Sequence, residues 1–297
     1  MHRLTPQQLV TLVLLTVFWG LNWPVMKIGV TGFPPLTFRA ASMLIGLPVL
    51  ALGLVLLKVP FRLPRRHWKE LALLTVTNML IWHVCIIFAV RQLSSGRAAI
   101  LGYTMPIFSA VIGAFVFGAA LAPRAWGGVL AAGVGVMLLL WHEFTGLAGH
   151  PAGVALALFA ACVWALGTQL LRRSRADVPT LTLSFWMTVI AALTMTLGAI
   201  VFESDRWQAP TAPVTWAILY NAVLIFGYAH AAWFTLARSL PPVASTLSVM
   251  FIPVLGVFSG ALWLGEVLHW QDWVAVALMV VAIASVLWPA RARRTVP

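Results

Sequence analysis

The sequence predicts an all-α membrane protein with ten transmembrane helices, arranged as two inverted repeats of five helices each. The first observation is that 62% of the 297 residues are hydrophobic and only 9% are charged, whereas a soluble domain carries about 25% charged residues. The second is that the apolar runs recur at the length of about 20 residues that crosses a bilayer. The mean hydropathy of +0.97 therefore leaves no soluble domain of useful size.

The expected helices are separated by short links that contain proline, glycine or basic residues. They cover residues 8–29, 35–57, 69–91, 96–119, 124–141, 152–172, 179–202, 213–236, 243–265 and 272–289. Prolines such as Pro60, Pro123 and Pro151 fall between the runs, where a helix has to end. The first run has spanning length and lacks a small-residue cleavage site, so we expect it to be the first helix and not a cleaved signal.

The distribution of basic residues predicts the orientation. If the N-terminus is cytoplasmic, most of the 19 Lys and Arg lie in cytoplasmic links, as the positive-inside rule requires. We therefore expect a multi-pass protein of the bacterial inner membrane with both termini in the cytoplasm. The net charge of +12 comes from these short clusters, so the expected partner is the lipid bilayer and not nucleic acid.

The chain also repeats itself at a spacing of 147 residues. This shift places Pro106 on Pro253, and it places His83 on His230. Each repeat holds an odd number of helices, so the second repeat must enter the membrane from the opposite side. We expect the repeats to be residues 1–147 and 148–297, with a binding site near the midplane between them.

Two stretches resemble the EamA-type drug/metabolite transporter superfamily. The first is Phe18-Trp19-Gly20 with Asn22 and Lys27, followed by Pro35 and Arg39; the second is Pro253, Leu264-Gly265-Glu266 and Gln271. The first repeat departs from the second pattern, because Ala119 stands where the superfamily has glutamate. In overall character the chain is similar to the YddG-like aromatic amino acid exporters. The resemblance implies a ten-helix exporter that works by alternating access on a broad range of substrates.

The few mid-membrane groups that are not plain hydrocarbon predict the binding site. Trp19, Asn22 and Trp23 share one helical face, which should turn toward a protein-lined space because an unpaired amide is costly in lipid. The candidate substrate-binding residues are Trp19, Asn22, Trp23, Asn78, Trp82, His83, Tyr103, Trp164, Thr168, Trp186, Tyr228, Ser245 and Ser248. Neutral donors and acceptors interleaved with ring faces suit a small amphiphilic solute with an aromatic body.

Structural alternatives exist for several of these residues. A single Asn, Ser or Thr in a bundle can hold helices together, and His83 with His230 can form symmetric structural hydrogen bonds. Lys27 and Arg39 lie near the expected outer helix ends, where we expect them to snorkel toward the interface.

Three prolines lie inside expected helices and are candidate hinges. Pro24, Pro106 and Pro253 each free a backbone carbonyl and permit a bend, and half-helices that hinge there could open one side while the other closes. The alternative is that they are static kinks.

No Asp or Glu falls in the middle of an expected helix, although secondary transporters commonly bind their coupling ion with an embedded carboxylate. We therefore expect an inner-membrane exporter of amino acids, above all aromatic or hydrophobic ones and related metabolites, that moves them down their own gradient. It needs no cofactor, metal or oligomer. The alternative is an exporter of cationic drugs or other small metabolites, with proton coupling. A channel or an intramembrane enzyme fits less well, because the chain has no rings of charge, HExxH motif or paired buried acids.

Overall fold

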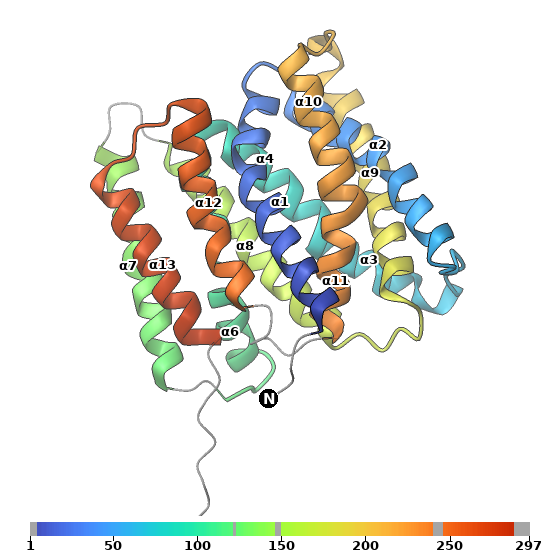
Figure 1. The fold of residues 1–297 in the computed structure, drawn as a ribbon, viewed down its shortest axis with the longest axis horizontal. Coiled ribbons are helices and arrows are strands. Elements are labelled where there is room, and N and C mark those ends of the chain that lie inside the picture. Colours follow the sequence, from blue (N-terminus) through green and yellow to red (C-terminus); the bar gives the residue numbers. More distant parts are fainter. Residues whose placement is uncertain (1–4, 121–122, 146–149, 240–245, 288–297) are drawn as a thin grey trace, which may run out of the picture.

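The computed structural model describes residues 5–120, 123–145, 150–239 and 246–287, and these residues contain helices and no strand (Figure 1). The helices are α1 (Pro6–Thr31), α2 (Pro35–Leu56), η1 (Arg65–His67), α3 (Trp68–Thr75), η2 (Val76–Leu80), α4 (Ile81–Gln92), α5 (Ser95–Gly102), α6 (Met105–Phe115), α7 (Pro123–Thr145), α8 (Pro151–Arg172), α9 (Thr180–Glu203), η3 (Ser204–Arg206), α10 (Ala212–Tyr220), η4 (Asn221–Ala229), α11 (His230–Ser239), α12 (Thr246–Leu264) and α13 (Trp270–Leu287).

Seven stretches of helix among the described residues are long and apolar enough to cross a membrane. They are Pro6–Thr31, Pro35–Leu56, Arg65–Gln92, Ser95–Phe115, Pro151–Arg172, Thr180–Arg206 and Ala212–Arg238, and three shorter apolar helices accompany them at Pro123–Leu139, Phe251–Leu264 and Trp270–Ser285. The all-helical, multi-pass architecture is thereby confirmed. The number of ten spanning helices stays a prediction.

The two halves of the chain interdigitate. The closest helix pairs join the first half to the second: α7 with α13, α2 with α9, α1 with α12, and α4 with α8. In Figure 1, α7 and α13 stand together at one edge of the bundle, and α2 and α9 stand at the other. The centre of the bundle is therefore bordered by helices from both halves of the chain. We call the end of the bundle where α1 begins the proximal end and the end where α1 finishes the distal end.

The 147-residue register is visible in the backbone. Gly118 and Gly265 adopt φ angles of +66° and +65°, a conformation that glycine reaches without steric cost. Directly after each glycine, a backbone N–H donates to the carbonyl six residues earlier, Ala119 to Gly113 and Glu266 to Gly260. The same turn therefore ends α6 and α12.

Two long helices contain π-helical turns, η2 and η4, which continue α3 into α4 and α10 into α11. Such turns shift the side chains that follow them and are frequent at functional sites. Gly46 of α2 lies directly against η4, because a Cβ there would meet the carbonyl oxygen of Ala222 at 2.6 Å. The absence of a side chain at this position allows α2 and η4 to approach closely.

The expected helix 96–119 is divided. α5 ends at Gly102 and α6 begins at Met105, so Pro106 occupies the first turn of a new helix and not the interior of a continuous one. Proline is favoured in a first turn because the missing N–H would have no intrahelical acceptor there. Pro24 and Pro253 do lie inside α1 and α12, and the hinge role of all three prolines stays a prediction.

Candidate functional site

A small cavity of about 40 Å³ lies in the centre of the bundle. Its walls combine aromatic rings, apolar side chains and a few polar groups from both halves of the chain. The lining residues are Trp19, Asn22, Trp23, Met26, Arg39, Trp82, His83, Ile86, Tyr103, Met105, Trp164, Ile225 and His230. The structure thus brings together seven of the thirteen binding residues expected from the sequence.

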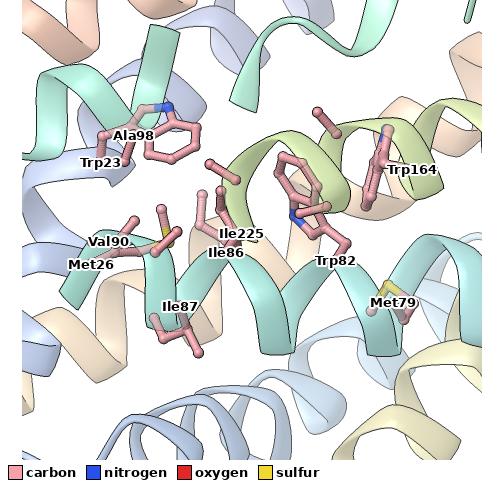
Figure 2. Packing of buried hydrophobic residues seen from close by; sticks show 14 of the residues in the cluster. Trp23, Met26, Met79, Trp82, Ile86, Ile87, Val90, Ala98, Trp164 and Ile225 are labelled. Atoms are coloured by element: carbon pink, nitrogen blue, oxygen red, sulfur yellow. The ribbon is translucent and has the colours of Figure 1, made fainter. Parts of the chain in front are cut away.

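Aromatic side chains contact one another around this cavity. Trp82 of α4 and Trp164 of α8 have ring centroids 5.0 Å apart, and Figure 2 shows the two indoles facing each other between these helices. Trp23 packs edge-on against Tyr103 at 6.1 Å. Because these rings already fill much of the centre, a solute as large as an aromatic amino acid requires them to move apart.

The two histidines that the 147-residue shift aligns meet at the cavity. The imidazoles of His83 in α4 and His230 in α11 lie 5.0 Å apart, and both pack on the ring of Phe226 at 5.1 and 5.2 Å. His230 Nδ1 lies 3.0 Å from the carbonyl oxygen of Ile225, so this nitrogen carries the proton. Neither ring nitrogen of His83 has a protein partner among the described residues.

Arg39 also lines the cavity, and the expectation that it snorkels to the interface was wrong. It lies one turn inside α2, and only 1% of its surface is exposed. Its Nη1 donates to Oδ1 of Asn221 at 3.3 Å and its Nη2 to the sulfur of Met26 at 3.0 Å. Its charge is held 5.6 Å from the centroid of the Phe226 ring. The sequence does show a basic residue in an apolar run, one turn after Pro34-Pro35. Because this position is close to the expected helix end, the sequence favoured an interfacial arginine over a buried one.

Four other expected binding residues lie elsewhere. Asn78 is buried on η2, donates to the carbonyl of Leu74 and packs against the backbone of Gly167. Thr168 is buried on α8, one turn beyond Trp164, and does not line the cavity.

Trp186 and Tyr228 serve other contacts. The indole N–H of Trp186 donates to the carbonyl of Phe61 at 2.7 Å, in the link after α2. Tyr228 packs edge-on against Phe18 and borders a separate groove next to α1 and α11. Ser245 lies outside the described residues, and so does the side chain of Ser248.

Charged groups bind helix ends at the distal end of the bundle. The ammonium of Lys27 donates to the last carbonyls of α4, those of Val90 and Leu93 among them at 3.0 and 2.7 Å, so it also does not snorkel. The buried carboxylate of Glu203 accepts from the backbone N–H groups of Leu36 and Thr37 at the start of α2. Carboxylates at helix N-termini and an ammonium at a C-terminus are favoured by the helix dipole.

A second carboxylate binds the start of α5 at the same end. Glu266 accepts from the backbone N–H groups of Ser95 and Gly96 and from the Ser95 hydroxyl. Beside it, Arg97 of α5 donates to Asp272 in the first turn of α13 at 2.8 Å. These contacts join α5 to the segment that follows α12 and to the first turn of α13.

The proximal end has its own charged junction. Arg66 and His67 both bind Asp177, which joins the link after α2 to the link after α8. The hydrogen bonds from Arg66 and then from His67 hold the pKa of the Asp177 carboxyl below its usual range. Among the described residues there is no group of three or more His, Cys, Asp or Glu that could hold a metal ion.

A family model described as the EamA-like transporter family matches the chain twice, over residues 8–141 and 151–288. The chain belongs to the EamA-like transporter family. The two matches cover most of the described helices. Membership in this family and the apolar helices identify the chain as a multi-pass membrane transporter.

Several bacterial transporters are similar to this chain over most of their length. It is 24% identical to the "Uncharacterized transporter YoaV" of Bacillus subtilis, covering 86% of this chain and 88% of that protein. It is 27% identical to the "Uncharacterized inner membrane transporter YedA" of Escherichia coli K12, with 93% and 91% covered. It is 25% identical to the "Probable amino-acid metabolite efflux pump" of Salmonella typhimurium, with 95% of each covered.

A solved crystal structure has the same fold. Its chain superimposes with a TM-score of 0.71 at 20% identity, covering 94% of this chain and 96% of that one. At this identity the likeness concerns the fold alone.

Proposed function

We propose that this transporter exports amino acids and related small metabolites with an aromatic or hydrophobic body, by alternating access through the central cavity. The observation that carries the proposal is a buried cavity between the two halves, lined by indole rings together with a few polar groups. Ring faces provide contact area for an apolar body, and a small number of polar groups fixes orientation. The relatives named as amino-acid metabolite efflux pumps support the same substrate class.

The composition of the cavity favours amino acids over cationic drugs. Its lining contains an arginine and two histidines and no carboxylate, so a permanently cationic solute would meet a like charge and no counter-charge. A zwitterion can satisfy the arginine with its own carboxylate. Export of cationic drugs was the alternative raised by the sequence. Export of a quaternary amine in the test below would therefore contradict this proposal.

Alternating access requires the two ends of the bundle to open in turn. The interdigitated halves and the charged contacts at each end provide separate closures for this cycle. The direction of export follows from the predicted topology. In that topology the proximal end faces the cytoplasm, so the solute would enter there and leave at the distal end. Transport is then driven by the solute gradient alone, since no embedded acid among the described residues is available to bind a coupling ion.

The experiment is efflux of labelled tryptophan from vesicles that contain the purified protein. Labelled lysine, glutamate and a quaternary amine are the competing solutes, and empty vesicles give the background. We expect tryptophan and phenylalanine to leave much faster than from empty vesicles, and the quaternary amine to remain. Export of the amine with retention of all amino acids would contradict the proposal.

Two tryptophan variants test whether the cavity is the route. Trp164→Ala removes a buried ring of the cavity, and ring contacts contribute about 0.5–1.5 kcal/mol beyond area burial, so we expect tryptophan affinity to fall by about tenfold. The matched control is Trp216→Ala on α10, a tryptophan that is 72% exposed and lies outside the cavity. Equal affinities in the two variants would show that the solute passes elsewhere.

A further inference from the structure

We propose that Arg39 binds the carboxylate of the transported solute and makes a carboxylate a requirement for tight binding. The inference rests on the proposed function, because it assigns one part of the solute to one side chain of the same cavity. Arg39 was not among the binding residues expected from the sequence, and its position in the structure is what assigns it this role.

The first step is that the charge of Arg39 lacks a counter-ion. Its side chain is almost completely buried, and no carboxylate of the described residues forms a hydrogen bond or ion pair with it. A buried charge is expensive unless it is paired. Two carboxylates at the distal end have other partners, since Glu203 binds the start of α2 and Glu266 binds the start of α5.

The second step is that its donors are incompletely used. A guanidinium carries five N–H donors in a planar fork, and the protein partners here are one amide oxygen, on Asn221, and one thioether sulfur, on Met26. Both partners are neutral, and Nε has none among the described residues. A carboxylate would supply charge and a planar pair of acceptors, which matches the fork.

The third step concerns the groups that face Arg39. His83 and His230 are the titratable side chains of the cavity near it, and neither provides a negative charge. Asn22 is one helical turn from Met26 on α1, and its Oδ1 is buried without a protein partner. The ammonium of an amino acid bound by Arg39 would find an acceptor at this oxygen, so the two residues together match a zwitterion.

A structural role for Arg39 has to be distinguished from this. The guanidinium links α2 to η4 through Asn221 and lies near the Phe226 ring, and both contacts stabilise the fold without any solute. A purely structural arginine would affect all solutes equally when it is replaced. An anchor for the carboxylate would affect only solutes that carry one.

The test measures binding of tryptophan, tryptophanamide and indole-3-propionate to purified protein by calorimetry. In the wild type we expect the two carboxylates to bind about 10- to 100-fold more tightly than the amide, the range that a charged hydrogen-bonded pair supplies. In Arg39→Gln the carboxylates should weaken by that factor and the amide by less than about threefold. Arg39→Lys keeps the charge without the fork, so it should show an intermediate preference.

Lys27→Gln is the control, because Lys27 is another cation of the distal half, half-buried, whose ammonium already donates to backbone carbonyls. We expect it to keep the full preference for carboxylates. Equal weakening of all three ligands in Arg39→Lys, or an unchanged preference in Arg39→Gln, would overturn the proposal. If Arg39→Gln does not fold, the ligand preference of Arg39→Lys alone tests the proposal. A wild type that binds none of the three ligands contradicts the proposed function, whereas one that binds tryptophanamide as tightly as tryptophan contradicts only the role of Arg39.

Discussion

Glu266, which follows α12, is hydrogen-bonded to the start of α5 at the distal end of the bundle, and replacing it with glutamine should favour opening of that end. Its carboxylate accepts from the N–H of Ser95 at 2.6 Å, the hydroxyl of Ser95 at 2.9 Å and the N–H of Gly96 at 3.2 Å. Those donors belong to the first turn of α5, whereas Glu266 follows α12. If α5 and α12 separate at their distal ends during transport, all three bonds have to break.

The size of the effect follows from these contacts. Hydrogen bonds to a charged group contribute about 1.5–3 kcal/mol and neutral ones about 0.5–1.5 kcal/mol. The amide of glutamine can keep one oxygen as acceptor, but its nitrogen cannot accept from the second set of donors. Because the site is partly exposed, we expect a net loss of about 2 kcal/mol in the free energy of closure. This corresponds to roughly a 30-fold larger population of the distally open state.

The assay is the labelling rate of a single cysteine by a membrane-impermeant maleimide added on the distal side. Cys85 and Cys162 are first replaced by alanine, and Ala98→Cys provides the reporter, because Ala98 is fully buried on α5 three residues beyond Ser95. Figure 2 shows it beside Trp23 of the cavity wall. Labelling should be slow in the background protein and roughly 30 times faster with Glu266→Gln.

The control is Asp205→Asn, which breaks an exposed ion pair with Arg206 at the same end. Exposed pairs contribute little to stability, so the labelling rate should remain within twofold of the background. A rate in Glu266→Gln that is no faster than in this control would refute the reasoning. The distal closure would then have to depend on contacts other than this carboxylate.

Three further predictions concern stability. Gly46→Ala should destabilise the protein by about 1–3 kcal/mol through overpacking against η4, whereas Gly53→Ala in the same helix, where an added Cβ meets nothing within 4 Å, should be neutral or stabilising in thermal unfolding. The pKa of Asp177 is lowered in the folded protein. The ionised carboxylate therefore stabilises the fold at pH values above its pKa in the unfolded chain, about 3.9, and this stabilisation is lost as the pH falls through its pKa in the folded protein. The difference in melting temperature between wild type and Asp177→Asn should therefore disappear in acid. Trp186→Phe loses the hydrogen bond to Phe61 and should lower stability by about 1 kcal/mol with unchanged affinity for tryptophan.

The helices could be predicted from the sequence because hydrocarbon thickness limits their length. The expected spans 35–57 and 152–172 agree with α2 and α8 to within one residue at each end. The break between α5 and α6 was missed, because an apolar run with one proline has the same composition whether the helix bends or stops. The turns at Gly118 and Gly265 have nearly the same φ angle, so the two glycines that the 147-residue shift aligns occupy the same kind of turn.

Several residues of the cavity wall were predictable because their rings lie deep in apolar runs, whereas the equally deep amide of Asn78 lies outside the cavity. Trp82, His83 and Trp164 were found in this way, and all three line the cavity. Trp186 was not predicted correctly, because an indole near a helix end can donate its N–H to the backbone of a link instead of facing the cavity. Its acceptor here is the carbonyl of Phe61. Helical spacing gives the face of a side chain on its own helix, but it does not give the depth at which two helices meet.

The charges around the cavity also bear on what drives transport. Arg39 is a fixed cation, and His83 and His230 lie in ring contact with each other near it. A proton that bound to either imidazole in the empty cavity would be placed beside another positive charge, with no carboxylate of the described residues to offset it. The described lining of the cavity thus offers no group of opposite charge to bind a driving cation, which is consistent with the proposed movement of a zwitterion down its own gradient.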